Sequence, residues 1–303
     1  MNKEKYRGAL LGLACGDAVG TTVEFKARHS FTPVTDMTGG GPFRLNAGEW
    51  TDDTSMALCL AHSLLHCNGF DPEDQMNRYC NWYRVGYMSC TGECFDIGST
   101  VRSALHRYLE TKHPFSGCTD AHSAGNGSIM RLAPIPMFYV EDVEATLHYA
   151  GESSRTTHGA EEAIECARLF AAQLRTALVG GTKDDILMYH AYQSTLETVQ
   201  SLAEASYRHF TVQHVVGSGY VVRSLEAALW CFYHSDSFEE AVLRAANLGD
   251  DADTTAAIVG QVAGAYYGVG GIPARWVSQL AMKDEIERLA DRLYEERFVL
   301  SHA

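Results

Sequence analysis

The chain has little positive charge for its length. It holds 24 Lys and Arg residues against 38 Asp and Glu residues among 303, which gives a formal net charge of −14. No run of Lys or Arg occurs, which argues against a nucleic-acid-binding surface, because such surfaces need clustered basic residues. The chain also lacks an apolar stretch of about 18 residues, the length that a membrane-spanning helix requires. We therefore expect neither nucleic acid nor a membrane as a partner.

Cysteine pairs of the kind that mark disulfide frameworks or zinc sites are also missing. The nine cysteines are scattered, and even the closest pair, Cys90 and Cys94, forms no CxxC motif. We expect reduced, mostly buried thiols in a cytoplasmic protein. The basic and then apolar N-terminus resembles a signal peptide, but Asp17 follows too soon, so we interpret this segment as part of the mature structure.

Helical periodicity dominates what is present. Apolar residues recur at helical spacing in residues 56–65, 163–178 and 225–232. Alternation typical of a strand is scarce, and the one candidate, residues 212–222, contains glycines that weaken it. No Pro-rich or Ser-rich linker divides the chain. The pattern predicts a compact all-α fold with one domain over residues 1–303, and for such an acidic, patch-poor chain we expect a monomer.

Glycines form two ladders with a spacing of four residues, from Gly8 to Gly20 and from Gly260 to Gly268. A glycine inside a helix costs roughly 1 kcal/mol relative to alanine, so a ladder needs a packing reason. Glycine stripes let two helix backbones approach closely. We predict that these two helices pack side by side and bring the loops at their ends together.

Two acidic clusters, WTDDTSM (50–56) and NLGDDADTTA (247–256), each open an apolar helical segment. Asp and Thr are also good helix N-caps, and the helix dipole favours anions there, so either cluster alone has a structural explanation. If the two helix starts converge, the clusters supply only oxygen ligands, which suit Mg²⁺, Mn²⁺ or Ca²⁺ better than zinc. Bridging carboxylates can hold two cations about 3.5–4 Å apart, as in two-metal hydrolases.

The chain resembles the ADP-ribosylglycohydrolase family, and within it the branch that contains dinitrogenase reductase-activating glycohydrolase. The resemblance runs nearly end to end through GLACGDAVGTTVEF (12–25), MTGGGPFRLNAGEWTDDTSM (37–56), FDIGST (95–100), AGNGSIMR (124–131), TTH (156–158) and GDDADTTAAIVGQVAGAYYG (249–268). It implies a compact all-α fold with a binuclear Mg²⁺ or Mn²⁺ centre in a cleft at one end. It also implies hydrolytic removal of ADP-ribose from protein side chains, arginine foremost, with free ADP-ribose as the product.

The resemblance also implies which residues hold the metals and move protons. The implied metal ligands are Thr51, Asp52, Asp53, Asp251, Asp253 and Thr254, and Asp250 lies outside this pattern. Glu24 and Asp96 are the implied catalytic residues. From the residues alone, Glu24 could equally be a solvated loop acid and Asp96 a residue that caps the next helix. We expect Asp17 to fix a turn through bonds from its side chain to the backbone.

The implied substrate-binding residues are Gly98, Ser99, Thr100, Gly125, Asn126, Gly127, Ser128, His158 and Tyr220. Backbone N–H groups at the glycine-rich turn around Asn126 suit phosphate oxygens, although the same residues also form ordinary Asn-Gly turns. For His158 the alternative is a structural histidine. For Tyr220, implied to stack on adenine, the alternative is packing in the core.

Alternative functions stay open at this point. Another ADP-ribosyl linkage, to serine, a nucleobase or a small guanidine compound, would use the same residues. A two-metal phosphohydrolase could direct the same acidic clusters against a nucleotide diphosphate. A third possibility is a protein that binds ADP-ribose, or blocks a toxin, without catalysis.

Overall fold

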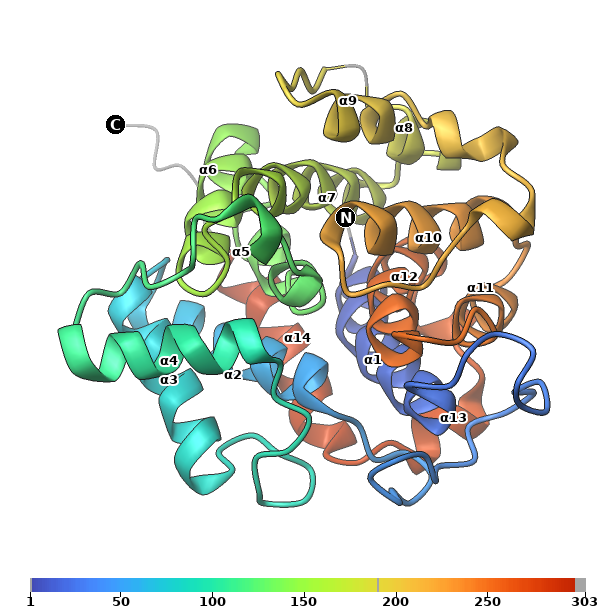
Figure 1. Ribbon diagram of the computed structural model, residues 1–303, viewed down its shortest axis with the longest axis horizontal. Coiled ribbons are helices and arrows are strands. Elements are labelled where there is room, and N and C mark those ends of the chain that lie inside the picture. Colours follow the sequence, from blue (N-terminus) through green and yellow to red (C-terminus); the bar gives the residue numbers. More distant parts are fainter. Residues whose placement is uncertain (1, 190, 298–303) are drawn as a thin grey trace.

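The computed structural model describes residues 2–189 and 191–297, and its architecture is helical (Figure 1). The α-helices are α1 (Lys3–Gly20), α2 (Asp52–Cys67), α3 (Pro72–Val85), α4 (Ser99–Thr111), α5 (Pro134–Phe138), α6 (Val143–Arg155), α7 (Glu161–Val179), α8 (Lys183–Leu187), α9 (Glu197–Ala203), α10 (Val221–Tyr233), α11 (Phe238–Ala246), α12 (Ala252–Tyr267), α13 (Ala274–Gln279) and α14 (Lys283–Glu295). Short 3₁₀ turns lie at η1 (Thr21–Val23), η2 (Ala121–Ser123), η3 (Asn126–Ser128), η4 (Ser206–His209), η5 (Val212–His214) and η6 (Val269–Gly271).

The expected all-α fold is confirmed. Within the described ranges only isolated β-bridges occur, and no strand is formed. The segment 212–222 becomes a 3₁₀ turn, a connection and the start of α10, in agreement with its glycine content. None of the helices among the described residues has the length and apolar character needed to span a lipid bilayer.

Helices α1 and α12 lie side by side in the centre of the molecule, as the glycine ladders predicted (Figure 1). A Cβ added at Gly8 would lie 2.1 Å from the carbonyl oxygen of Gly264, and one at Gly20 would lie 2.4 Å from that of Ala252. The two helices therefore run antiparallel with their backbones in contact, and no side chain fits between them. This packing brings the C-terminal end of α1 next to the N-terminal end of α12.

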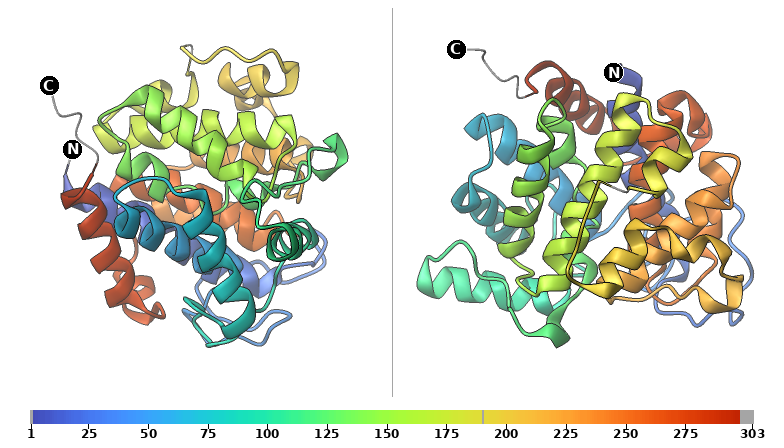
Figure 2. Two further views of the ribbon diagram at one scale, coloured as in Figure 1. Left: turned by 90° about the vertical axis from the view of Figure 1, so that its left-hand side faces the viewer. Right: turned by 90° about the horizontal axis from the view of Figure 1, so that it is seen from above.

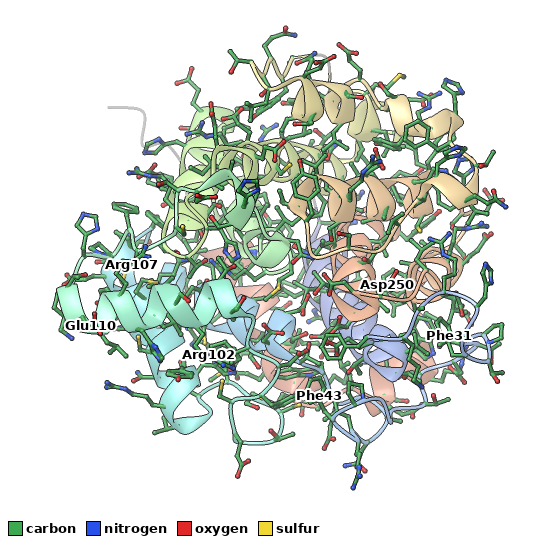
Figure 3. All side chains as sticks on the ribbon, in the orientation of Figure 1. Phe31, Phe43, Arg102, Arg107, Glu110 and Asp250 are labelled. Carbon is green, nitrogen blue, oxygen red and sulfur yellow. The ribbon has the colours of Figure 1, made fainter. Side chains whose placement is uncertain are left out.

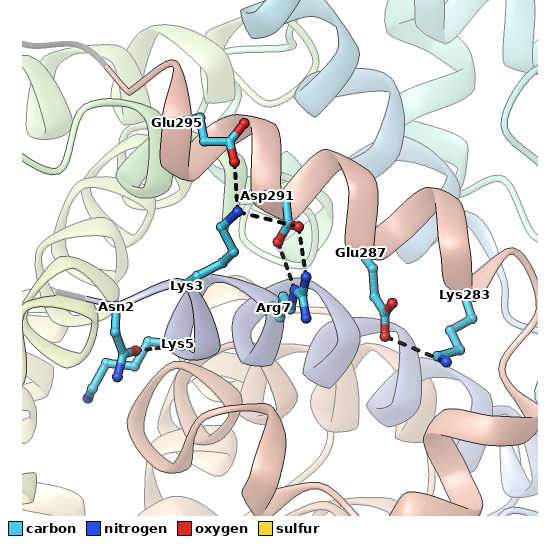
Figure 4. Close-up of polar contacts among 8 residues, drawn as sticks. All are labelled: Asn2, Lys3, Lys5, Arg7, Lys283, Glu287, Asp291 and Glu295. Atoms are coloured by element: carbon cyan, nitrogen blue, oxygen red, sulfur yellow. Dashed lines mark hydrogen bonds and ion pairs between the residues drawn. The ribbon is translucent and has the colours of Figure 1, made fainter.

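The other helices surround this pair and share one hydrophobic core with it. In Figure 1, α3 and α4 lie to the left of the pair, α10 above it and α11 to its right, and Figure 2 shows the same arrangement from two further sides. Helix α14 covers α1, where Arg7 donates to Asp291 at 2.7 Å and Lys3 to Glu295 at 2.6 Å (Figure 4). All nine cysteines are free thiols, and five of them are buried.

Candidate active site

The two acidic clusters meet at one end of the α1–α12 pair, as predicted. Asp52 and Asp53 are the first residues of α2, whereas Asp251 directly precedes α12 and Asp253 lies in its first turn. Carboxylate oxygens of Asp17, Asp53 and Asp253 lie within 4.8 Å of one another. Residues far apart in the chain thus form a single acidic group, because the glycine ladders hold α1 against α12 and Asp17 of α1 holds the start of α2.

A cavity of about 490 Å³ opens beside this group. Most of the predicted site residues line it: Glu24, Asp52, Asp96, Gly98, Ser99, Thr100, Gly125, Asn126, Gly127, His158, Asp251, Asp253 and Thr254. The predicted residues that do not line it are Thr51, Asp53, Ser128 and Tyr220. The first three of these are buried, so the acidic group extends beneath the wall of the cavity.

The donor set of this acidic group fits divalent cations. It consists of carboxylate and hydroxyl oxygens, the ligands that Mg²⁺, Mn²⁺ and Ca²⁺ prefer. Asp53 Oδ1 and Glu24 Oε2 are buried and have no hydrogen-bond partner. A buried carboxylate oxygen without a partner is costly, and a bound cation would satisfy it.

The raised pKa values of the acidic residues also favour a bound cation. Burial raises the pKa of Asp53 and of Asp253 well above the ordinary value, and neighbouring carboxylates raise both further. Burial also raises the pKa of Asp96 to about 7. Like charges this close cannot all ionise without a counter-charge, and a divalent cation reverses the balance in favour of the carboxylates.

Asp17 corrects the expectation that it fixes a local turn. It lies within the last turn of α1 and accepts hydrogen bonds from the N–H and hydroxyl groups of both Thr51 and Thr54, at 2.6–3.1 Å. The N-terminus of α2 is therefore capped by a carboxylate from α1, whereas the side chain of Thr51 makes no cap bond. A charged residue inside an otherwise apolar glycine ladder was the available signal for this role.

Asp251 stands at the N-cap position of α12, but its side chain makes no cap hydrogen bond. Its Oδ2 accepts instead from Asn126 Nδ2 at 2.7 Å. The Asn126 amide also donates to Ser224 Oγ at 3.0 Å. The glycine-rich turn at η3 is thereby tied directly to the acidic group.

Glu24 and Asp96 both line the cavity, beside Asp253 of the acidic group. Each brings a carboxylate oxygen within 4.8 Å of the other and of Asp253. Glu24 is only 4% exposed, so the alternative of a solvated loop acid is wrong. The N-cap residue of α4 is Gly98, without a side-chain cap bond, so Asp96 does not cap that helix either.

His158 lies at the other end of the cavity, with its ring against the glycine-rich turn. A Cβ at Gly127 would lie 2.6 Å from its Cε1 atom, so only glycine fits there. Arg131 Nη2 donates to Thr157 Oγ1 at 2.7 Å, and Thr157 Oγ1 lies 2.9 Å from His158 Nδ1. Arginine can only donate, so the Thr157 hydroxyl accepts from Arg131 and can donate to His158 Nδ1, which places the proton of the imidazole on Nε2.

The environment of His158 keeps the imidazole neutral. Burial, aided by the nearby Arg131 guanidinium, lowers its pKa to about 3. The residue is thus both buried and part of the cavity lining, with an N–H donor on the Nε2 side, toward Gly125 and Gly127. Arg131 lies in the motif AGNGSIMR (124–131) and Thr157 in TTH (156–158), but no local pattern indicates that these two residues contact each other.

Tyr220 and Ser128 differ from the rest of the predicted set. Tyr220 is 37% exposed and its hydroxyl donates to Glu162 at 2.7 Å, so the alternative of core packing is wrong. Its backbone pairs with Gly125, yet its side chain does not line the cavity. Ser128 Oγ is buried and has no hydrogen-bond partner. Binding roles for these two residues remain predictions.

The sequence is similar to known proteins over nearly its whole length. The model of the ADP-ribosylglycohydrolase family matches residues 2–302. ADP-ribosylarginine hydrolase Tri1 of Pseudomonas putida (strain GB-1) is 47% identical over 292 residues, which covers 96% of this chain and 78% of the relative. ADP-ribosyl-[dinitrogen reductase] glycohydrolase of Rhodospirillum rubrum is 32% identical over 301 residues, which covers 96% and 95%.

The protein is also similar to a solved structure. The chain of a structure described as an ADP-ribosylglycohydrolase-related protein complex is similar with a TM-score of 0.88 and 43% sequence identity, over 98% of this chain and 99% of that one. The family match spans almost the whole sequence, and the relatives are matched over most of their own length. The protein therefore belongs to the ADP-ribosylglycohydrolase family.

Proposed function

We propose that this protein hydrolyses the N-glycosidic bond between ADP-ribose and an arginine side chain of a target protein and releases free ADP-ribose. The observation that carries the proposal is the cavity in which Asp52, Asp251 and Asp253 adjoin Glu24 and Asp96. The arginine linkage is supported by two relatives named ADP-ribosylarginine hydrolase Tri1, from Pseudomonas putida and Serratia proteamaculans, at 47% and 41% identity.

Two divalent cations, Mg²⁺ or Mn²⁺, are assigned to the acidic group. The residues that would hold them are Thr51, Asp52, Asp53, Asp251, Asp253 and Thr254. The buried, unpartnered Asp53 Oδ1 supports this assignment, as does the all-oxygen donor set. When bound, such cations polarise hydroxyl groups of the distal ribose and stabilise negative charge that develops on them.

We assign the remainder of ADP-ribose to the rest of the cavity. The diphosphate is assigned to the turn Gly125–Ser128, with the Nε2–H group of His158 as a further donor toward an oxygen of the substrate. Ser99 and Thr100, which also line the cavity, offer hydroxyl groups, and Gly98 allows close approach of the backbone. Adenine is assigned to the exposed ring of Tyr220 beyond the turn.

Proton transfer is assigned to Glu24 and Asp96. Hydrolysis adds a hydroxyl group to C1″ of the ribose and a proton to the departing guanidine nitrogen, so a carboxyl group must lie within hydrogen-bond reach of the reacting atoms. Glu24 and Asp96 adjoin Asp253 in the cavity, and Glu24 Oε2 has no partner in the protein.

The test is to incubate the wild-type protein with a target protein mono-ADP-ribosylated on arginine and to follow the target by intact mass. The proposal expects loss of the whole ADP-ribosyl group and free ADP-ribose in solution. AMP in solution, with phosphoribose left on the target, would indicate a phosphohydrolase. An unchanged target together with tight ADP-ribose binding would indicate a binding protein, and release from a serine-linked peptide alone would contradict the arginine linkage.

A further inference from the structure

Three phenylalanine rings contact one another in a row, Phe25 against Phe43 and Phe43 against Phe95, and Phe25 lines the cavity beside Glu24 and Asp96. Phe25 follows Glu24, Phe95 precedes Asp96, and Phe43 comes from the turn between α1 and α2. The ring centroids of Phe25 and Phe43 lie 6.4 Å apart, and those of Phe43 and Phe95 lie 5.3 Å apart. We call Phe25, Phe43 and Phe95 the aromatic platform.

Phe25 is held in an exposed position by its backbone. Its side chain is 68% exposed, and its φ of 62° lies in the left-handed region, which is unfavourable for a non-glycine residue. Its N–H donates to the carbonyl of Asp250 at 2.8 Å, and the N–H of Asp250 donates to the carbonyl of Lys26 at 2.7 Å. This pair of bonds fixes the ring beside the loop that carries Asp251, although burial would be the favoured state of a large apolar side chain.

Phe43 is fixed as well, because its turn is closed and packed. Gly40 and Leu45 exchange backbone hydrogen bonds of 2.7 and 2.9 Å across the turn. A Cβ at Gly41 would lie 2.0 Å from the carbonyl oxygen of Thr21, so the turn sits directly on the segment that leads to Glu24. In Figure 3, Phe43 projects from this turn, well separated from Phe31 at the right-hand edge.

The chemistry of this end of the cavity suits a guanidinium group. Aromatic faces attract cations, and the planar guanidinium stacks on them while its apolar stem adds contact area. The adjoining carboxyl groups of Glu24, Asp52 and Asp96 give this end of the cavity an acidic wall. A neutral leaving group such as serine would gain nothing from the same combination.

We propose that the aromatic platform binds the guanidinium group and stem of the target arginine and so selects arginine-linked substrates. The assignment rests on the proposed function, which requires the departing group to leave past Glu24 and Asp96. Phe25 lines the cavity next to these residues. The aromatic platform is thus a site for the leaving group, distinct from the surfaces assigned to ADP-ribose.

The test compares steady-state kinetics of Phe25→Leu, Phe43→Leu and Phe25→Tyr on an arginine-linked substrate. The two leucine variants should raise KM roughly 3- to 30-fold with little change in kcat, because a cation–π contact of this kind is lost, and Phe25→Tyr should restore the wild-type KM. The dissociation constant of ADP-ribose, measured by calorimetry, should stay unchanged in all three. Phe31→Leu, a matched change on the same loop but outside the cavity, should leave KM unchanged (Figure 3).

A second measurement needs no variant. Free arginine should inhibit the wild-type enzyme competitively, whereas citrulline, which has the same length but a neutral end group, should not. Equal inhibition by arginine and citrulline, or an unchanged KM in both leucine variants of an active enzyme, would overturn the role of the aromatic platform alone. Absence of any release by the wild-type protein would instead overturn the proposed function, and this assignment with it.

Discussion

Asp17 Oδ1 accepts hydrogen bonds from both the N–H and the hydroxyl group of Thr51, each at 2.9 Å, and thereby joins the end of α1 to the start of α2. Asp17→Ala would leave these buried donors without a partner. We predict that the free energy of unfolding falls by about 2 kcal/mol or more, since each unsatisfied buried group costs about 1–3 kcal/mol. Urea unfolding measures the loss. Glu110→Ala, an exposed acidic position on α4, should change stability by less than about 0.5 kcal/mol.

The contact between α1 and α12 makes a second prediction. Alanine normally stabilises a helix interior by about 1 kcal/mol relative to glycine, yet a Cβ at Gly264 would lie 1.9 Å from the carbonyl oxygen of Gly8. Gly264→Ala should therefore lower the melting temperature or prevent folding. At Gly270 a Cβ would meet nothing within 4 Å, so Gly270→Ala serves as the control. Equal melting temperatures for the two variants would contradict the close packing.

Cation removal should lower the stability of the folded protein. The carboxyl groups of Asp53 and Asp253 are buried together, and a ligand that binds only the folded state stabilises it by mass action, by about 2.7 kcal/mol at one hundred times its dissociation constant. We predict that Mg²⁺ or Mn²⁺ raises the melting temperature and that EDTA reverses the rise. Asp253→Asn should reduce the shift. A melting temperature that does not respond to millimolar amounts of either cation would exclude a stable metal centre.

The lowered pKa of His158 leads us to predict that the stability of the folded protein depends on pH. Its pKa is about 3 in the folded protein against 6.5 ordinarily, so the unfolded chain takes up a proton that the folded protein does not. The stability that this difference contributes is fully present above pH 6.5 and is lost as the pH falls toward 3, by about 1.4 kcal/mol per pH unit. Between pH 7 and pH 5, wild type should lose roughly 2 kcal/mol more than His158→Gln in urea unfolding. Parallel losses would mean that His158 titrates normally in the folded protein.

Much of the fold could be predicted because its signals are periodic. The glycine ladders indicated the contact between α1 and α12, and this contact places the loop after α1 beside the loop before α12. Local sequence was sufficient for this contact because each helix carries its own half of the interface. The convergence of Asp52 and Asp53 with Asp251 and Asp253 depends also on the hydrogen bonds from Thr51 and Thr54 to Asp17, which join the start of α2 to α1.

Other parts of the site could not be predicted, because they depend on contacts between distant segments. Asp17 lies 34 residues before its partner Thr51, and its place in the glycine ladder marks the residue as unusual without indicating that partner. The aromatic platform likewise assembles from two connections, the one between α1 and α2 and the one between α3 and α4. The direction of the Tyr220 side chain depends on a bond to Glu162, which lies 58 residues away. Such roles emerge only once the helices have set the relative positions of the loops.

The most direct test of the central claim is the initial rate of ADP-ribose release from a protein mono-ADP-ribosylated on arginine, measured with Mg²⁺ or Mn²⁺ and again after EDTA. The account predicts release that requires the cation in wild type and is lost in Asp253→Asn, with the variant folded and still able to bind ADP-ribose. Release that continues at the same rate in EDTA and in Asp253→Asn would contradict it.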